Sequence, residues 1–418
     1  MQFISESMED FDRSITAIDL GSSQIKVVIA RINNYDDIEI IGVGVAPSTG
    51  IKSGSIINID ATIRSIHEAI NLAELTAGMQ VTDIIVNVSG KSIYSKNFKS
   101  VVAITNKERI VYEEDIQRVI DAAEPRLSSN EKILHIFPKD FSVDDQTNIK
   151  DPTGMTGVRL QADVHIVTTG ITSLTNLEKC FDMIGIPAEK KIISSFASAE
   201  AVLTSGEKDF GVAVVDIGDG ITDIIMYEEG GICYSGYIPL GGKSISQDIS
   251  TGLKTPLPIA EEVKKKFGHC ILDEISPTAK IELPSVGGRP AGSVPRQNLV
   301  NIIEPRVREI LEMVNTELEK TEKKSLLTGG IILTGGTSLL PGIELIAEEI
   351  FGLTVTVAKP NSLSGLYEKV SSPEFSTAVG MIKYIAMEQG DYEEDRELTK
   401  VGSGEVLKKV WGWIQKNL

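Results

Sequence analysis

Cysteine is rare in this chain of 418 residues, and Cys180, Cys233 and Cys270 lie far apart. Because no CxxC spacing or paired framework occurs, the sequence predicts neither disulfide bonds nor a zinc site and favours a reducing compartment. Long apolar runs are also lacking, since no stretch reaches the roughly 18 residues of a membrane-spanning helix. The first residues, MQFISESMEDFDRS, lack the apolar region of a signal peptide. We therefore expect a cytoplasmic protein.

Positive charge is scarce as well. The chain has 41 Lys and Arg against 59 Asp and Glu, a net charge of −18. Nucleic-acid binders gain affinity from Lys and Arg that neutralise phosphates, so this balance argues against nucleic acid as a partner. The four histidines are scattered, and the apolar surroundings of His135 and His165 predict buried strand residues and not ligands.

A strand-turn-strand pattern occurs twice. AIDLGSSQIKVVIARI at 17–32 and VVDIGDGITDIIMYEE at 214–229 share an apolar run, an Asp, a glycine turn and a β-branched run. Both predict a β-hairpin. A further strand and a helix are expected after each, with the first helix at 60–75 capped by Asp60 and the second beginning at Ser244. The shared order predicts two related α/β halves.

The remaining segments predict an inserted module, a loop, a long helix and a linker. Residues 86–168 contain several strand patterns and one helix, at about 112–123, and predict an α+β module inserted into the first half. The Gly- and Pro-rich stretch 284–295 predicts a loop, and apolar spacing predicts a helix over 299–324. From 388 to 400 the charges crowd and apolar residues disappear, which is typical of a linker.

The glycine turns of the two hairpins are candidate phosphate sites. Gly-rich turns present backbone N–H groups, and an aspartate at the preceding strand end can hold the water shell of Mg²⁺. A single such turn is usually an ordinary turn with a solvated aspartate, but two matching copies favour a site. Asp19 and Asp216 are the predicted Mg²⁺ residues. The predicted phosphate residues are Gly21, Ser22, Ser23 and Gln24, and Gly218, Asp219, Gly220 and Ile221, with Gly241, Gly242 and Lys243 in the next glycine turn.

Two further elements extend this candidate site. In LTGGTSLLPG, Gly335, Gly336 and Ser338 predict a close backbone approach to a purine, although tight αβ turns of this kind are common. In AEEVKKKFG, Glu261 and Lys264 are three residues apart on one helical face. They form either a ribose contact or an ordinary surface salt bridge.

In this order the hairpins, the A-E-x-x-K helix and the TGG turn resemble the actin, heat-shock chaperone and sugar-kinase superfamily. The detail resembles the bacterial cell-division FtsA family, in SGKSI, ILHIFPKDFSVDDQTNIKDPTGMTGVRLQADVHIVT, PSVGGRP, IEPRVREI, IILTGGTSLLPG and FSTAVGMIKY. The resemblance implies an α/β, actin-like (ribonuclease H-like) two-domain fold with duplicated βββαβα core halves. It also implies that the chain binds ATP and Mg²⁺, is at most a slow ATPase, and polymerises with itself.

The resemblance also implies a division into subdomains and a partner, FtsZ. Subdomain 2B would face FtsZ, with Arg289 and Arg306 as contact residues, and subdomain 1C would form polymer contacts. The implied bounds are 1–12 for an acidic extension, 13–85 with 169–207 and about 378–387 for subdomain 1A, 86–168 for 1C, 208–243 with 325–377 for 2A, 244–324 for 2B, 388–403 for an acidic linker and 404–418 for a membrane-targeting helix.

Two residues depart from the family pattern at the phosphate turns. Gln24 stands where a lysine is common, and Asp219 lies within a turn that commonly reads GGGT. A lost positive charge and an added negative charge should both weaken anion binding unless Mg²⁺ or Lys243 compensates.

The last fifteen residues, GEVLKKVWGWIQKNL, have an amphipathic helical pattern. They include both tryptophans of the chain, a residue type enriched at membrane interfaces. Docking of this helix on its own core is the alternative, but the acidic segment before it favours a reversible anchor to anionic lipid. The family resemblance implies that this anchor lies on the inner face of the cell membrane, at the division septum. The predicted membrane residues are Leu407, Lys408, Lys409, Val410, Trp411, Trp413, Ile414 and Leu418.

Two other functions remain open from the sequence. One is a sugar or acetate kinase, or a phosphatase, of the same superfamily, for which no distinctive catalytic residue stands out. The other is a PilM-like scaffold of pilus assembly, which has a related insertion. The tail and the PSVGGRP stretch favour cell division over both.

Overall fold

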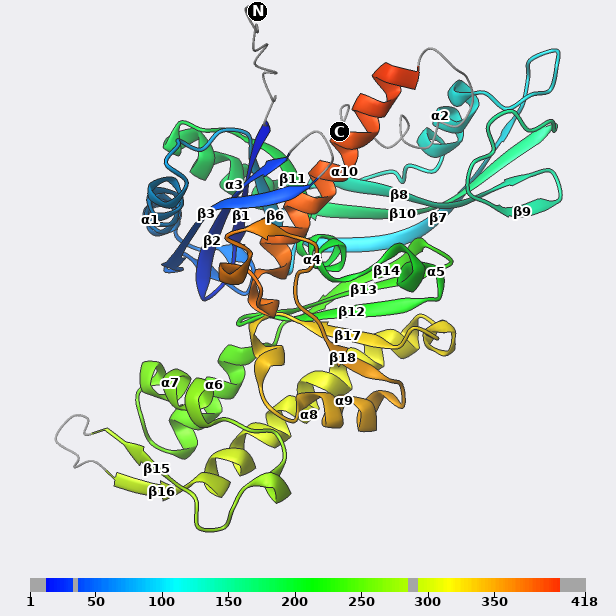
Figure 1. The fold of residues 1–418 in the computed structure, drawn as a ribbon. Helices are drawn as coiled ribbons and strands as arrows, with labels where there is room; N and C mark the ends of the chain where they lie inside the picture. Colours follow the sequence, from blue (N-terminus) through cyan, green and yellow to red (C-terminus); the bar gives the residue numbers. More distant parts are fainter. Residues whose placement is uncertain (1–12, 33–36, 285–291, 399–418) are drawn as a thin grey trace, which may run out of the picture.

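The computed structural model describes residues 13–32, 37–284 and 292–398 (Figure 1). The predicted N-terminal extension 1–12, the predicted contact residue Arg289 and the tail 404–418 lie outside the described residues. In the part of the chain that is described, no helix is long and apolar enough to cross a membrane.

Two β-sheets form the centre of the molecule, one in each half (Figure 1). The six-stranded sheet has the order β11-β6-β1-β2-β3-β19, and the five-stranded sheet has the order β14-β13-β12-β17-β18. In both, the first strand of an antiparallel three-stranded meander pairs with a parallel strand, and that strand pairs in turn with a second parallel strand. The predicted duplication is therefore confirmed. The strands are β1 (Arg13–Leu20), β2 (Gln24–Ile32), β3 (Ile38–Pro47), β6 (Ile84–Val88), β11 (Ala188–Ile193) and β19 (Ser364–Gly365), then β12 (Val212–Ile217), β13 (Thr222–Glu228), β14 (Gly231–Ile238), β17 (Ile331–Thr334) and β18 (Val355–Val357).

Helices complete a layered arrangement around the sheets. Alternate residues of β1 face opposite layers, so that Ala17 packs in the core between the two sheets and Ile18 packs in the core under α1 and α3. Helices α4 and α10 fill the space between the sheets, and α6 to α9 cover the outer face of the five-stranded sheet. The helices are α1 (Ile59–Ala77), α3 (Ile171–Ile184), α4 (Ser194–Val202), α5 (Ser205–Asp209), α6 (Gly242–Gly252), α7 (Leu257–Phe267), α8 (Arg296–Lys320), α9 (Ile343–Phe351) and α10 (Ser376–Leu398).

Residues 93–170 form a separate four-stranded sheet, here called the inserted module. Its order is β7-β10-β8-β9, and helix α2 packs on it over a small core of its own. The predicted boundary at residue 86 is wrong, because it cuts β6, which pairs with β1 and β11 in the first half. The elements are β7 (Ile93–Ala103), α2 (Glu113–Asp121), β8 (Glu131–Val143), β9 (Gln146–Ile149) and β10 (Arg159–Gly170).

Three local predictions are wrong. Asn58, and not Asp60, caps α1, since its side chain accepts a hydrogen bond from the N–H of Ala61. The supposed loop 284–295 ends in strand β16 (Gly292–Pro295), which pairs with β15 (Lys280–Leu283). The supposed linker is helical as far as Leu398, because its Glu, Gln and Arg are good helix formers and an established helix extends at little cost.

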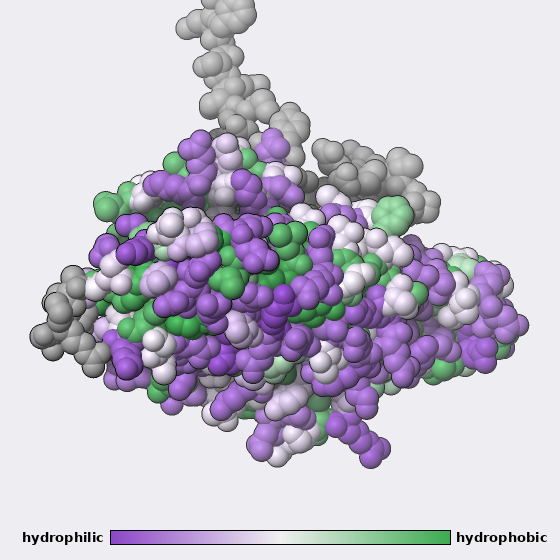
Figure 2. Space-filling model, turned by 90° about the horizontal axis from the view of Figure 1, so that it is seen from below, coloured by the Kyte–Doolittle hydropathy of each residue, from purple (hydrophilic) through white to green (hydrophobic). Residues whose placement is uncertain are grey.

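The lower part of the molecule is largely hydrophilic on its outer face. Seen from below, hydrophilic side chains predominate and apolar ones form small separate patches (Figure 2). Such scattered apolar residues are normal for a protein surface.

Two buried histidines should make folding stability depend on pH. His135 accepts a hydrogen bond from the N–H of Ile193, and His165 contacts Asn97 and Ser235, so the prediction of satisfied strand histidines is confirmed. Burial lowers the pKa of both to about 3. A group whose pKa is lower in the folded state takes up its proton on unfolding, so stability is retained above pH 6.5 and falls as the pH drops towards 3.

We expect the free energy of unfolding to fall by roughly 1 kcal/mol per pH unit for each of these histidines below pH 6.5. Urea titrations at pH 7 and pH 5 measure this slope. Replacing His165 with Asn should flatten it, whereas the control His67→Asn, at an exposed position on α1, should leave it unchanged. Equal slopes in the parent and in His165→Asn would contradict the assignment.

Candidate functional site

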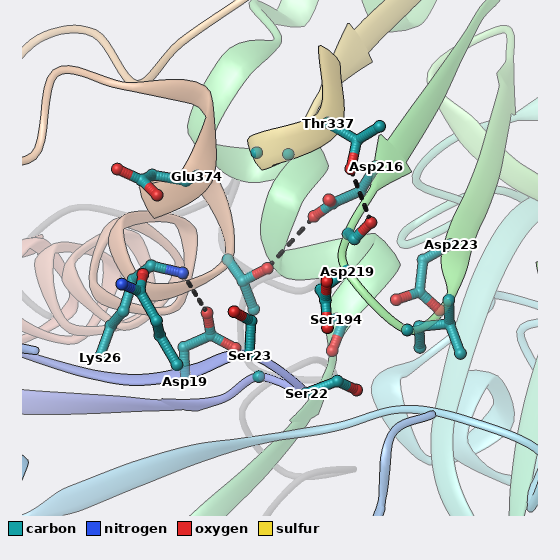
Figure 3. A pocket seen from close by; sticks show the side chains of 18 of the residues that line it. Asp19, Ser22, Ser23, Lys26, Ser194, Asp216, Asp219, Asp223, Thr337 and Glu374 are labelled. Carbon is teal, nitrogen blue, oxygen red and sulfur yellow. Dashed lines mark hydrogen bonds and ion pairs between the residues drawn. The ribbon is translucent and has the colours of Figure 1, made fainter. Parts of the chain in front are cut away.

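A cavity of about 500 Å³ opens where the two halves face each other. Both hairpin turns line it, together with the turn after β17, helix α7 and the short helix η5 (Pro373–Phe375) that precedes α10. The close-up shows side chains from both hairpins, from the turn after β17 and from η5 around one space (Figure 3). Segments that are far apart in the sequence therefore form one site because the duplicated sheets place equivalent turns opposite each other.

The first hairpin contributes a buried carboxylate with two partners. Asp19 lies at the end of β1, 3.6 Å from the Nζ of Lys26, and the side-chain amide of Asn87 donates to it at 2.9 Å. The same amide lies 2.9 Å from the hydroxyl of Ser194, so β6 and α4 help to fix Asp19. Burial raises the pKa of Asp19, and Lys26 and Asn87 partly offset this rise. A further cation near Asp19 would therefore be favourable.

The second hairpin contributes the equivalent carboxylate in a different setting. Asp216 accepts hydrogen bonds from the hydroxyls of Ser198 at 2.5 Å and Thr377 at 3.3 Å. Asp223 is its partner on the neighbouring strand and also lines the cavity. Burial raises the pKa of both carboxyls, and for Asp223 the nearby charges of Asp216 and Asp19 add to the rise. This side of the cavity therefore holds two close carboxyl groups, and burial disfavours the charged form of each.

The two copies of the hairpin differ at one position that matters for charge. Lys26 pairs across the first hairpin with Asp19, and Asp223 pairs across the second with Asp216. Each partner follows its aspartate by seven residues. One half thus presents a cation and the other an additional carboxylate, so the duplicated cleft is electrostatically asymmetric. Aligning the repeats residue by residue reveals this pair, which our prediction missed.

Close backbone contacts hold the turns together. A Cβ atom on Gly220 would lie 2.6 Å from the hydroxyl oxygen of Ser22, which means that the two hairpin turns touch across the cleft. Gly335 has φ +83°, and a Cβ there would lie 2.2 Å from a carboxylate oxygen of Asp216. The hydroxyl of Thr337 donates to the carbonyl oxygen of Gly218 at 2.9 Å. The TGG turn is therefore packed directly against the turn of the second hairpin.

The pair on α7 is an internal ion pair that also lines the cavity. Lys264 lies 2.7 Å from Glu261 and donates to the carbonyl oxygen of Gly242 at 2.9 Å. Ser246 also donates to Glu261. The sequence left open whether this pair is a ribose contact or a salt bridge. The two are compatible, because the same side chains form a salt bridge and face the cavity.

Most of the predicted cofactor residues line one cavity. The lining includes Asp19, Gly21, Ser22, Ser23, Gln24, Asp216, Gly218, Asp219, Gly220, Ile221, Glu261, Lys264, Gly335 and Gly336. Gly241, Gly242, Lys243 and Ser338 are not among the lining residues. The N–H groups of Gly242 and Lys243 bond to the carbonyl oxygens of Gly218 and Asp219, and the hydroxyl of Ser338 bonds within its own turn. Further lining residues that the sequence did not point to include Lys26, Asn87, Ser194, Asp223, Thr337, Glu374 and Thr377.

The predicted partner residue Arg306 is already engaged within the chain. Its guanidinium bonds to Asp248 on α6 at 2.6 Å and also contacts Glu309. These bonds raise its pKa and connect α8 to α6. Substituting Arg306 would therefore disturb this helix contact as well as any partner surface.

The donor set of the cavity fits Mg²⁺ held through water. Asp19 and Asp216 both face the cavity, but their oxygens are partly occupied by Lys26, Asn87, Ser198 and Thr377. Among the described residues no group of three or more His, Cys, Asp or Glu side chains is arranged to hold a metal directly. A hydrated ion between the two carboxylates suits this geometry, because Mg²⁺ gives up its water reluctantly.

The fold is that of the actin-like proteins. A PilM-PilN type IV pilus biogenesis complex has a chain that aligns with a TM-score of 0.63 at 17% identity, over 90% of this chain and 98% of that one. MreB5 of Spiroplasma citri bound to ADP aligns with a TM-score of 0.55 at 14% identity, over 91% and 98%. At such low identity these likenesses show the fold alone, and they confirm the predicted fold class.

Sequence comparison identifies the family within this fold. The family model "Cell division protein FtsA" matches residues 213–380, and the model "SHS2 domain inserted in FTSA" matches residues 90–168. FtsA of Pseudomonas aeruginosa is 36% identical over 97% of this chain and 98% of its own length, and FtsA of Neisseria meningitidis is 38% identical over 98% and 100%. The chain belongs to the FtsA family of cell-division proteins.

Proposed function

We propose that this chain binds ATP with Mg²⁺ in the cavity and anchors FtsZ filaments to the inner face of the cell membrane at the division septum. The observation that supports nucleotide binding is that both glycine hairpins, the TGG turn and the Glu261–Lys264 pair line one cavity. Membership of the FtsA family supports a role in division. This membership also sets aside the kinase, phosphatase and pilus alternatives.

Different lining residues of the cavity would contact different parts of the proposed ligand. The turns at 21–24 and 218–221 would hold the phosphates between them. Leu339, Leu340 and Pro341 offer an apolar surface beside the TGG turn, which suits a purine. Glu261 and Lys264 would contact the ribose. When bound, Mg²⁺ would neutralise phosphate charge beside Asp19 and Asp216.

We regard ATP chiefly as a structural ligand and hydrolysis as slow. The carboxylates on the second hairpin add negative charge where phosphate charge would lie, which weakens the electrostatic stabilisation that phosphoryl transfer requires. Lys26, Lys264 and Lys265 line the cavity and oppose this charge. Lys243, which we expected to do so, lies close enough to lower the pKa of Asp219 but is not in the lining.

The proposed anchor is the C-terminal segment 404–418, and the support for it is its amphipathic sequence pattern with three lysines and both tryptophans. One short helix binds lipid weakly. Polymerisation through the inserted module would place many such helices on one filament and strengthen attachment through effective concentration.

Flotation of FtsZ on lipid vesicles tests the proposed function. With vesicles that contain phosphatidylglycerol, FtsZ polymerised with GTP should float together with the full chain. Deletion of 404–418 should leave both proteins in the bottom fraction, whereas the deleted chain should still co-sediment with FtsZ filaments without vesicles. Flotation that survives the deletion would rule out the anchor, and absence of FtsZ binding at micromolar concentration would rule out the partner.

Asp219 should weaken nucleotide binding through its charge. It lies in the second phosphate turn, where burial raises the pKa of its carboxyl and Lys264 partly offsets the rise. Replacing Asp219 with Gly or Asn should strengthen MgATP binding by about 1 kcal/mol, or roughly fivefold, because a negative charge beside the phosphates is removed. Calorimetric titration measures the dissociation constant. An unchanged constant in both variants would contradict the inference about the charge, although the turn could still bind phosphate.

A further inference from the structure

The inserted module contacts both halves of the molecule, although the chain enters and leaves it from the first half. At its base, the ring of Phe137 on β8 lies 4.9 Å from that of Phe196 on α4, in the core between the two sheets. Farther along, β7, β8 and β10 lie beside β14, a strand of the second half (Figure 1). The module therefore bridges the two walls of the cleft.

The contact with β14 consists of specific polar bonds. The hydroxyl of Ser95 donates to the carbonyl oxygen of Ser235 at 2.6 Å, and the amide of Asn97 donates to that of Cys233 at 2.8 Å. His165 is only 1% exposed and lies between Asn97 and Ser235, with its ring nitrogens 2.7 Å and 2.9 Å from them. A short chain of bonds thus connects β10 through a buried imidazole to the second half.

An ion-pair cluster adds a second attachment. Glu228 on β13 lies 2.5 Å from Lys139 of the module and 2.6 Å from Lys323, which follows α8. The Glu228 and Lys139 side chains are largely buried, and the two lysines lower the pKa of Glu228. This cluster joins the module, the five-stranded sheet and the end of α8.

Strand β14, which the module contacts, also pairs with a strand that lines the proposed nucleotide cavity. Tyr237, two residues beyond Ser235 on β14, pairs across the strands with Asp223, which lines the cavity. In this structure the two hairpin turns approach each other across the cleft, since a Cβ atom on Gly220 would lie 2.6 Å from the hydroxyl oxygen of Ser22. Opening the cleft would move β13 and β14 away from the first half. The module, packed into the first half at its base, would resist this movement through its bonds to β14.

We propose that the inserted module acts as a strap that holds the cleft closed, and that its junction of Asn97, His165 and Ser235 with β14 must break before the cleft opens. Hydrogen bonds and ion pairs suit this role, because water can replace them when the surfaces part. The strap does not depend on the proposed function, since it concerns the unliganded chain. If the chain does bind ATP, the strap also slows release of the nucleotide.

Hydrogen exchange of the full chain without nucleotide tests the strap. In the double variant Asn97→Ala/Ser235→Ala, backbone amides of the turns 21–24 and 218–221 should exchange about tenfold faster than in the parent. The matched control Gln146→Ala lies on β9 at the far edge of the same sheet and should behave as the parent. Unchanged exchange at both turns, in a double variant whose thermal unfolding is still cooperative, would overturn the proposal.

A second readout separates the strap from nucleotide binding. A fluorescent ATP analogue with Mg²⁺ should dissociate about tenfold faster from the double variant than from the parent, with little change in the association rate. If the amides of the turns exchange faster but the analogue dissociates at an unchanged rate, the proposed effect on nucleotide release is wrong and the strap itself is supported. A parent chain that binds no analogue would overturn the proposed function and the effect on release, and the exchange experiment would still decide the strap.

Discussion

Gly380→Ala is expected to lower the free energy of unfolding by about 3 kcal/mol or more. Gly380 lies where α10 crosses α4 between the two sheets, and a Cβ atom there would lie 1.6 Å from the carbonyl oxygen of Ala197. The obstacle is backbone, so no side chain can rotate to make room, and the two helices must separate. Because these helices fill the core shared by both halves, the whole molecule should be destabilised.

Gly206→Ala provides the matched control. Gly206 is also helical, in α5, but a Cβ there would meet nothing within 4 Å. Alanine should therefore stabilise the chain slightly, by about 0.5–1 kcal/mol, because it restricts the unfolded state. Urea denaturation followed by circular dichroism gives both values. Similar effects of the two substitutions would show that α4 and α10 separate at little cost.

Gly335→Ala is expected to weaken MgATP binding at least about hundredfold, which corresponds to roughly 2.7 kcal/mol. The left-handed conformation of Gly335 costs other residues of order 1–3 kcal/mol, and the added methyl group would push against Asp216 and the carbonyl oxygen of Ile217. The TGG turn and the turn at 218–221 would then have to move apart. Both are proposed to contact the nucleotide, so the loss should be large.

The neighbouring residue Gly336 offers a control within the same turn. A Cβ on Gly336 would come no closer than 3.6 Å, to the Cβ of Glu374, which is an ordinary contact. Gly336→Ala should therefore leave the conformation of the turn intact, and any loss of MgATP affinity should stay well below that of Gly335→Ala. Calorimetry measures binding, and the shift of Tm with added MgATP checks it independently. If Gly335→Ala binds as tightly as Gly336→Ala, the TGG turn does not position the nucleotide.

Several features were predictable from the sequence because local chemistry dictates them. The β-branched runs around GSS and GDG can form little except hairpins, and their repetition after 197 residues implied the duplicated sheets that the structure shows. The glycine-rich turns also marked most of the cavity lining. By contrast, charge crowding after residue 388 predicted a linker, but α10 continues to Leu398, since helix propensity does not require an apolar face once packing has started the helix.

The sequence by itself determined the hairpins, the two halves and the family, because period-2 patterns, glycine turns and extended similarity are properties of the chain alone. The tertiary structure alone decided which side chains meet. Lys26 was recognised only when β1 and β2 placed it beside Asp19, and the Asn97–His165–Ser235 junction arose only when the module lay against β14. Such contacts join residues as much as 140 positions apart, and their energies depend on burial and distance, neither of which is encoded in any short stretch of sequence.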